Sequence, residues 1–213
     1  MPQPSSNPTS RTRFSRVRAA APNVALAALW SFFVARHLLF FIETHEPAVL
    51  GVIALESLVV TLFIIRREAK DISRSRIALA ATVLGTFAPL ALVPNDAAAA
   101  GQQLASVIQL AGLAAALVSL GSLRRSFGLV PSNRGIRTTG MYRLVRHPLY
   151  ASYGVVWIGY MLANPSLWNA VVVAFAIVGQ AARIAFEERL LMQDEAYVAY
   201  AGTTRYRLVP GLY

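Results

Sequence analysis

Residues 148–186 read PLYASYGVVWIGYMLANPSLWNAVVVAFAIVGQAARIAF, and this stretch decides the fold. It contains two apolar segments, 148–163 and 168–186, which are separated by a short turn with Pro165. A helix needs about 20 residues to cross a bilayer, with a range of about 17–25. The second segment has this length, and the first is slightly short at 16 residues. The stretch therefore predicts an antiparallel pair of membrane helices.

Four similar apolar segments precede this pair. Of the 213 residues, 56% are apolar and 14% are charged, whereas a soluble domain has roughly 45–50% and about 25%. So few charges exclude a disordered chain and disfavour a soluble globule. The sequence predicts an all-α fold, a polytopic transmembrane helical bundle of about six spans, with five spans and a re-entrant segment as the alternative. The six segments are 23–42, 47–65, 77–94, 101–123, 148–163 and 168–186.

The Lys and Arg residues alternate with the predicted spans. Nineteen of the 20 lie in segments that would share one side of a six-span bundle, and Arg36 is the exception. The intervening loops contain none. Cytoplasmic loops carry such an excess of basic residues, so we expect an integral, multi-pass membrane protein with both termini in the cytoplasm. The four basic segments are 1–22, 66–76, 124–146 and 183–207.

Composition also limits the kinds of site. Residues 1–22 are rich in Pro and Ser and predict a disordered basic tail, followed by a single membrane domain over 23–213. The net charge of +10 could suit nucleic acid, but its placement in loops favours membrane lipids, so no nucleic-acid partner is expected. The chain has no cysteine and three separated histidines, which predicts no thiol chemistry and no metal site. The sequence sets no oligomeric state.

Three polar residues lie inside the first two predicted spans. Arg36 and His37 belong to the first span and Glu56 belongs to the second. Charges within a bilayer are costly and are usually paired. Because Arg36 and Glu56 would lie at similar depth in an antiparallel hairpin, we predict an ion pair between them that locks the hairpin. The alternative is that these residues line a polar cavity.

A second polar group gathers at the predicted cytoplasmic end. The loop 124–147 ends in Arg146, His147 and Pro148, and Pro148 stands where a helix begins, a position that proline tolerates. A helix N-terminus binds anions, including carboxylates. On the last span, residues 180, 183 and 187 share one helical face. Arg183 and Glu187 could form a simple pair on this face, or they could bind a ligand together with the loop.

Three pieces of sequence occur in order around these residues. They are Gly140-x-Tyr142-x3-Arg146-His147-Pro148-x-Tyr150, Arg183-x3-Glu187-Glu188-x2-Leu191 and Tyr197-x2-Tyr200, with Thr204 and Pro210 as looser matches. In these pieces the chain resembles the isoprenylcysteine carboxyl methyltransferase family and its wider phospholipid-methyltransferase-like relatives. The resemblance covers residues 124–210. It is specific for the superfamily and says little about the substrate.

The resemblance implies an integral membrane enzyme that transfers a methyl group from S-adenosylmethionine to a lipophilic acceptor. It implies a cytoplasm-facing cofactor pocket formed by the loop, the last two spans and the C-terminal tail. Arg183 would face the acceptor, and Arg183 and Glu187 would be the catalytic residues. The implied cofactor-binding residues are Gly135, Ile136, Arg137, Tyr142, His147, Pro148, Leu149, Tyr150 and Glu187.

The methyl acceptor stays open at this point. Carboxyl O-methylation of an isoprenylcysteine-like substrate is the main expectation, because a carboxylate is ionised at neutral pH and needs no base. An amine or thiol would need one, and Glu187 or Glu188 would be the candidate. The alternatives are a phospholipid amine, an isoprenoid or a small thiol. Two other classes are a small membrane transporter, suggested by Arg36, His37 and Glu56, and a non-enzymatic membrane scaffold held by the basic loops.

Overall fold

The protein is described by a computed structural model that covers residues 8–45, 47–95 and 101–212. The described residues form seven α-helices, three short 3-10 helices and one pair of two-residue strands. In chain order the elements are α1 (Pro8–Thr44), α2 (Pro47–Ile65), β1 (Asp71–Ile72), α3 (Arg76–Phe87), η1 (Ala88–Ala91), α4 (Gln102–Leu123), η2 (Arg124–Ser126), β2 (Ser132–Asn133), η3 (Gly140–Arg143), α5 (Pro148–Ala163), α6 (Leu167–Leu191) and α7 (Glu195–Thr203).

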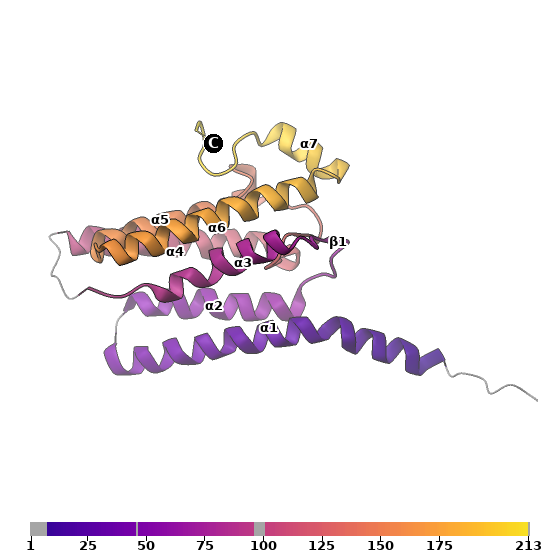
Figure 1. The fold of residues 1–213 in the computed structure, drawn as a ribbon, viewed down its shortest axis with the longest axis horizontal. Helices are drawn as coiled ribbons and strands as arrows, with labels where there is room; N and C mark the ends of the chain where they lie inside the picture. Colours follow the sequence, from indigo (N-terminus) through magenta and orange to yellow (C-terminus); the bar gives the residue numbers. More distant parts are fainter. Residues whose placement is uncertain (1–7, 46, 96–100, 213) are drawn as a thin grey trace, which may run out of the picture.

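Helices α1 to α6 run along one common axis and form the bundle (Figure 1). Five of the six predicted apolar segments each correspond to one of these helices, and the all-α membrane bundle is confirmed. The predicted segment 77–94 is the exception, because α3 ends at Phe87 and a 3-10 turn with Pro89, η1, follows it. Helix α1 begins at Pro8, earlier than expected, so residues 8–22 of the predicted disordered tail are helical. This segment is rich in Arg and Ala, which are good helix formers. Residues 1–7 of the predicted tail lie outside the described part of the chain.

The surface of the bundle is apolar and its interior holds polar groups. On α6, the exposed fractions of Phe175 and Val178 are 53% and 61%, whereas Gln180 and Arg183 are buried at 6% each. In a water-soluble helix this pattern would be reversed. Intramembrane polar residues usually face the bundle interior, as they do here. The apolar side chains on the outside of α6 therefore suit a lipid environment.

Three helical stretches are long and apolar enough to cross a membrane by length and composition: Ala21–Thr44, Gln102–Ser126 and Leu167–Leu191. Two shorter apolar helices, Val49–Ile65 and Arg76–Ala91, lie beside them. Helix α5 has only 16 residues. Short spans are accommodated by tilting, by local thinning of the bilayer or by packing inside the bundle.

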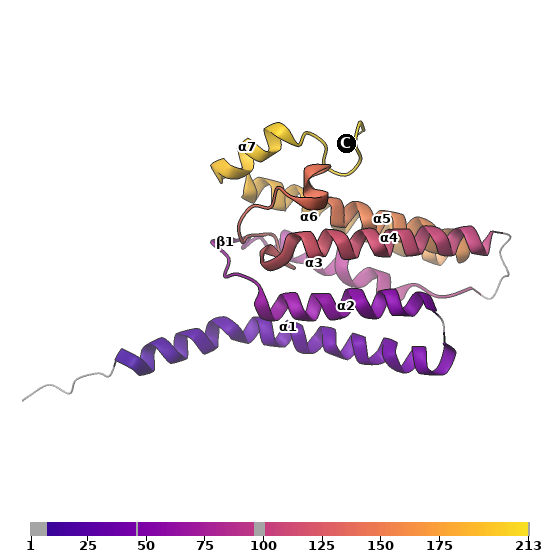
Figure 2. The ribbon, with the colours of Figure 1, turned by 180° about the vertical axis from the view of Figure 1, so that it is seen from behind.

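The connections that carry the basic residues meet at one end of the bundle, which we call the basic end. Here β1 pairs antiparallel with β2, and this joins the loop after α2 to the loop after α4. The Arg67 N–H donates to the Arg125 carbonyl at 2.8 Å. Helix α7 and the C-terminal segment lie over the same end (Figure 2). The predicted grouping of basic segments on one side is therefore present in the folded chain.

At the end of the bundle opposite the basic end, hydrogen bonds from asparagine side chains connect the segment after η1 to the start of α6. Asn169 at the start of α6 is fully buried, and its Nδ2 donates to the carbonyls of Val93 and Asn164 at 2.9 Å each. The Val93 N–H donates back to its Oδ1 at 3.0 Å. Ser166 caps the same helix by accepting from the Asn169 N–H. These bonds satisfy backbone groups for which lipid would offer no partner.

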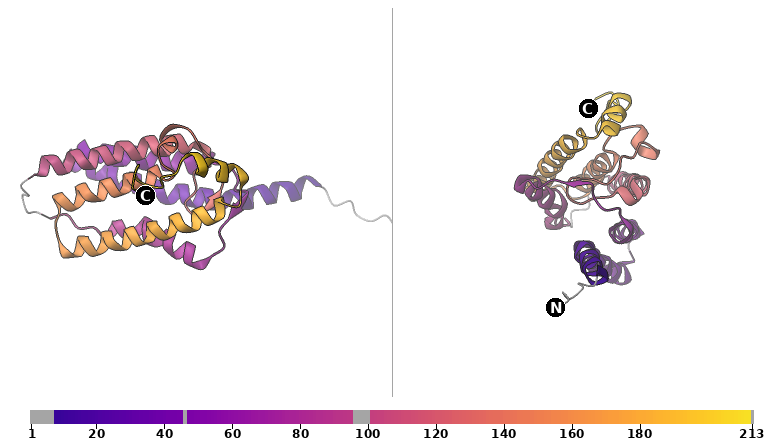
Figure 3. Two further views of the ribbon diagram at one scale, coloured as in Figure 1. Left: turned by 90° about the horizontal axis from the view of Figure 1, so that it is seen from above. Right: turned by 90° about the vertical axis from the view of Figure 1, so that its right-hand side faces the viewer.

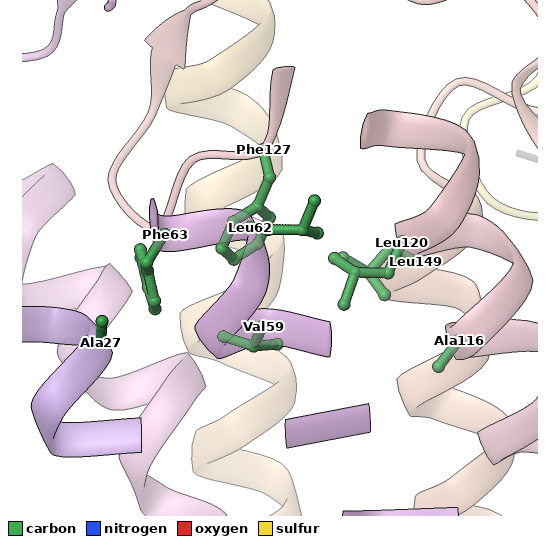
Figure 4. Close-up of a cluster of buried hydrophobic side chains, with 8 residues drawn as sticks. All are labelled: Ala27, Val59, Leu62, Phe63, Ala116, Leu120, Phe127 and Leu149. Carbon is green, nitrogen blue, oxygen red and sulfur yellow. The ribbon is translucent and has the colours of Figure 1, made fainter. Parts of the chain in front are cut away.

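The apolar core lies between α1, α2, α4 and α5, towards the basic end (Figure 4). Phe63 is fully buried, and its ring lies 5.3 Å from those of both Trp30 and Phe127 in edge-on geometry. This core holds the α1–α2 hairpin against α4, and α3 packs instead on α6. Two sets of helices therefore lie side by side: α1, α2, α4 and α5 form one, and α3 and α6 form the other. The right-hand panel of Figure 3 looks along the helix axes. The core residues are Ala27, Val59, Leu62, Phe63, Ala116, Leu120, Phe127 and Leu149.

Glycines permit the close contact between α3 and α6. A Cβ atom placed on Gly179 would lie 2.4 Å from the Gly85 backbone nitrogen. Small residues at helix crossings in membranes allow backbones to approach in this way, and van der Waals contact then stabilises the pair. Because Gln180 and Arg183 follow Gly179 on α6, this contact also sets where their side chains lie.

We expect Gly179→Ala to destabilise the protein by about 1–3 kcal/mol, because the added methyl group would force the α3 backbone away. Thermal unfolding of the purified protein in detergent measures the effect. Gly154→Ala is the matched control, because nothing lies within 4 Å of a Cβ at Gly154. Equal unfolding temperatures for the two variants would contradict the proposed contact.

Candidate active site

One cavity of about 330 Å³ runs from the basic end into the middle of the bundle. This volume is within the usual range for small-molecule sites, about 300–1,000 Å³. Its outer part is polar and comes from the α4–α5 loop, the adjoining ends of α5 and α6, and α7. Its inner part is mostly apolar and comes from α1, α2, α3, η1 and α5. The inner walls include Trp30, Val52, Leu55, Val59, Pro89 and Trp157.

The structure brings together almost all of the residues that the sequence analysis selects. Pro148 is the exception, since it does not line the cavity. It is fully buried at the first position of α5, where the helix begins without a side-chain cap. The selected residues that line the cavity are Gly135, Ile136, Arg137, Tyr142, His147, Leu149, Tyr150, Arg183 and Glu187.

Tyr150 stands at the junction of the two parts of the cavity. Its hydroxyl donates to Glu187 Oε2 at 2.7 Å, and its ring centroid lies 5.6 Å from that of His147. The Arg183 guanidinium carbon lies 5.2 Å from the ring centroid, which is within cation–π range. One aromatic residue on α5 thus joins the loop-side imidazole to the carboxylate and the guanidinium of α6.

Arg183 is held by neutral groups. Its Nη2 donates to the Leu129 carbonyl at 2.7 Å, and its Nη1 donates to Gln180 Oε1 at 3.1 Å and to Thr86 Oγ1 at 3.4 Å. Glu187 is bonded to Tyr150 instead, so no ion pair joins Arg183 to Glu187 in the described structure, and the simple i,i+4 pair is not formed. The Arg183 Nε is buried without a partner. Within the described residues the guanidinium therefore has no carboxylate partner and keeps one donor for a ligand.

The adjacent Glu188 organises the basic end. Its Oε1 accepts from Arg146 Nε at 2.8 Å and lies 3.2 Å from His147 Nε2, and its Oε2 accepts from Arg207 Nε at 2.8 Å. The Glu188 side chain is only 7% exposed. Backbone bonds reinforce this arrangement, because the Arg146 and His147 N–H groups donate to the carbonyls of Tyr206 and Arg207. One carboxylate thus fixes the loop, the start of α5 and the C-terminal segment.

Three tyrosines, Tyr142, Tyr197 and Tyr200, form a cover over the polar part of the cavity. The Tyr200 hydroxyl donates to the Tyr142 carbonyl at 2.6 Å. Burial raises the pKa of Tyr200 to about 12 and also raises the pKa of Tyr142 well above its ordinary value. Both phenols therefore stay neutral near neutral pH. They can donate hydrogen bonds or present an aromatic face, but they cannot act as phenolate bases.

The loop before Gly140 contributes a second unused donor. Gly135 has a φ angle of +96°, a conformation that favours glycine, and its N–H donates to Asn133 Oδ1 at 3.0 Å. Two residues later, the Arg137 Nε is buried without a partner. Buried polar groups are normally hydrogen-bonded. Arg137 lines the same cavity as His147 and Leu149 at the uncapped start of α5, and these two features together suit a negatively charged group of a ligand.

Residues 103–197 match the sequence model of the phospholipid methyltransferase family. The chain carries a phospholipid methyltransferase domain. This is the family of the isoprenylcysteine-methyltransferase-like membrane enzymes, so the resemblance is confirmed over these residues, and the match indicates a membrane methyltransferase. No curated protein matches the chain.

The methyltransferase domain match begins at α4, so the walls contributed by α1, α2 and α3 lie outside it. Sequence patterns gave no signal for Trp30 or Thr86, because an isolated Trp or Thr in an apolar helix is common. Glu188 belonged to the quoted motif and was considered only as a possible base, so its role in holding Arg146 and His147 was missed. The signal for this role was the pair of basic residues at the end of the loop, Arg146 and His147, which need a carboxylate nearby.

The predicted pair between Arg36 and Glu56 is wrong. The Glu56 Oε2 lies 3.0 Å from His37 Nδ1, and Arg36 is exposed on α1. Neighbouring positions on a helix point about 100° apart, so only one of Arg36 and His37 can face α2. Glu56 also lines the inner part of the cavity, which is the alternative placement that the sequence allowed.

We expect Glu188→Ala to destabilise the methyltransferase by about 3–5 kcal/mol, because it leaves Arg146 and His147 buried without their carboxylate. Glu187→Ala should lower the free energy of unfolding by only about 1 kcal/mol, because it removes one hydrogen bond, the one from the Tyr150 hydroxyl. Thermal unfolding without ligand measures both, and limited trypsin digestion at Arg205 and Arg207 reports release of the C-terminal segment. Equal destabilisation by the two substitutions would contradict the role assigned to Glu188.

Proposed function

We propose that the protein transfers a methyl group from S-adenosylmethionine to a lipophilic acceptor. The observation that carries this proposal is that the polar and apolar parts belong to one continuous cavity. Its polar part begins at the basic end, and its apolar part reaches Trp30 and Trp157 among the membrane helices. A water-soluble methyl donor and an oily acceptor need these two environments, and they need them in contact.

The residues of the polar part fit S-adenosylmethionine. The Arg137 Nε and the uncapped start of α5 would bind its carboxylate. Glu187 would accept hydrogen bonds from the amino group or the ribose hydroxyls. Tyr142 and Tyr150 offer aromatic faces for the adenine or for the positive charge. His147, Leu149, Gly135 and Ile136 complete the walls of this part.

When bound, S-adenosylmethionine supplies an electrophilic methyl group. The protein's own task is then alignment, since effective molarities reach about 10⁵–10⁸ M for well-placed groups. Arg183 lies against Tyr150, at the boundary between the two parts, and is suited to holding the acceptor there. The Tyr142, Tyr197 and Tyr200 cover would exclude water from the reacting atoms.

Carboxyl O-methylation of an isoprenylcysteine-like acceptor is the reaction that these groups support best. Arg183 lines the cavity and its Nε has no partner, and a guanidinium can bind a carboxylate through paired hydrogen bonds. A carboxylate oxygen already holds the electron pair for the new O–C bond, so no proton has to be removed. The bond from carbon to sulfur breaks at the same time, and its electron pair stays on sulfur.

A phospholipid amine is the second candidate, because the matched family is that of the phospholipid methyltransferases. An ammonium acceptor must lose a proton before its nitrogen can form a bond. Glu187 is the carboxylate at the junction of the two parts, and its contact with Tyr150 shows that it can accept a hydrogen bond there. We assign it as the base for this reaction.

We also propose that the basic end faces the cytoplasm, which places both termini there. The excess of Lys and Arg in the loops of this end supports the orientation. The polar part of the cavity would then open to the compartment that supplies S-adenosylmethionine.

Substitution at the polar part should weaken binding of the methyl donor. We expect His147→Ala and Glu187→Gln to weaken S-adenosylmethionine binding at least tenfold, measured by calorimetry on protein in nanodiscs. Glu68→Gln is the matched control, because Glu68 is exposed in the loop after α2 and does not line the cavity. Unchanged binding in both variants would refute the assigned donor site.

Arg183→Lys should separate acceptor binding from donor binding. Lysine keeps the charge but loses the planar fork that holds a carboxylate. We expect methyl transfer into a lipid extract, followed with labelled S-adenosylmethionine, to fall at least tenfold while donor affinity changes by less than about twofold. The methylated product from the wild-type protein identifies the acceptor. Loss of donor binding in Arg183→Lys would place Arg183 in the donor site instead.

A further inference from the structure

Glu56 is a carboxylate in the apolar part of the cavity. It belongs to α2, and Val52, Leu55 and Val59 of the same helix line the cavity around it. Its side chain is 15% exposed. Two residues that line the cavity are acidic, Glu187 in the polar part and Glu56 in the apolar part. The proposed methyl transfer does not use Glu56.

The contacts of Glu56 leave it short of hydrogen-bond donors. His37 is its one polar contact within the described residues, and the bond goes to Oε2. The same His37 nitrogen also lies 3.1 Å from the Phe33 carbonyl, so it serves two acceptors. An ionised carboxylate can accept about four hydrogen bonds. A carboxylate at membrane depth with unused acceptor sites, facing a cavity, is suited to a ligand that donates.

Glu56 and Arg183 lie at similar depth on different walls of the cavity. Glu56 is nine residues from the basic end of α2, and Thr86, which contacts Arg183, is ten residues from the basic end of α3. At 1.5 Å of helix rise per residue, Glu56 and Thr86 therefore lie about 14 Å and about 15 Å from the basic ends of their helices. Among the described residues no ion pair joins Glu56 to Arg183. A ligand between them would meet a negative group on one wall and a positive group on the other.

We infer that Glu56 is a specificity-determining residue that binds a hydrogen-bond-donating group of the lipophilic acceptor, and that His37 is the positioning residue for its carboxylate. This inference rests on the proposed function, in which the acceptor occupies the apolar part. The donor would be an N–H or O–H close to the group held by Arg183. An ammonium forms the strongest bond of this kind, because both partners are then charged.

The competing role for Glu56 is structural, as a lock between α1 and α2. If Glu56 only joins α1 to α2, its substitution would lower the stability of the hairpin and would change the affinities of all ligands of the cavity by the same factor. A residue that binds a donor would distinguish a ligand that carries N–H groups from one that does not. The two roles are therefore distinguished by the ratio of the affinities for a ligand with N–H groups and a matched ligand without them. A measurement of stability alone does not distinguish them.

The probes are ω-bromoundecylamine and its trimethylammonium analogue, which has the same charge and chain but no N–H. Bromine quenches tryptophan fluorescence on contact. The chain has three tryptophans, and a Trp168→Phe background leaves Trp30 and Trp157, which both line the apolar part. The protein is held in phosphatidylcholine nanodiscs, whose headgroups carry no N–H. Partition of the probes into the bilayer is equal for all variants and cancels in the comparison.

We expect the amine to bind about tenfold more tightly than its trimethyl analogue, and Glu56→Gln to bring this ratio close to one. Glu56→Asp, which keeps a shorter carboxylate, should give an intermediate ratio and guards against misfolding of the first variant. Glu43→Gln, at an exposed position on α1, is the matched control and should keep the wild-type ratio. A wild-type ratio near one, or an unchanged ratio in Glu56→Gln, would overturn the inference.

Probe binding needs no methyl donor, so the inference and the proposed function fail separately. A protein that shows the ratio but transfers no methyl group would refute the proposed function alone. A protein that transfers methyl groups but binds the two probes equally would refute the role of Glu56 alone.

Discussion

The buried carboxylate of Glu188 is the contact on which the basic end depends. It neutralises Arg146 and Arg207 and holds His147, three groups that come from a loop, a helix start and the C-terminal segment. Cations of this kind would repel one another and would face a costly loss of hydration without it. By gathering them around one acceptor, the chain closes the loop and the C-terminal segment over the end of α5 and α6. The polar part of the cavity exists because these segments are fixed there.

The second constraint is the lipid solvent, which determines where polar groups can lie. Lipid offers no hydrogen bonds, so the helices expose Leu, Ile, Val and Phe and turn Gln180, Arg183 and Glu56 inwards. In water such inward groups would weaken the core. Here they line a space between the α1–α2 hairpin and the α3–α6 pair, whose glycine contact sets the position of Arg183. The same solvent that makes these charges costly would also supply the lipophilic acceptor that we propose for the cavity.

Sequence patterns predicted the six membrane segments and most of the candidate site. Long apolar runs with interrupting basic loops have one simple solution in a bilayer, which is why most helices lie where they were expected. Helix α3 is shorter than its apolar run, because the chain turns into a 3-10 helix at Ala88–Ala91. The motif residues from Tyr142 to Tyr150 and on α6 are close in sequence or joined by a short hairpin, so their meeting could be anticipated. The partner of Glu56 could not be predicted from the sequence, because Arg36 and His37 are adjacent. The rotation of α1 about its axis decides which of the two faces α2.

The sequence by itself determined the membrane bundle, the shared side of the basic loops and the family motifs, because hydropathy and charge act locally along the chain. Tertiary structure alone decided that Glu188 holds the basic end, that Glu187 bonds to Tyr150 and that Glu56 faces the same cavity as Arg183. Each of these arrangements brings together side chains from different elements of the fold. They depend on side-chain direction and helix rotation at the crossings, and a pattern of residue types along one chain does not specify either.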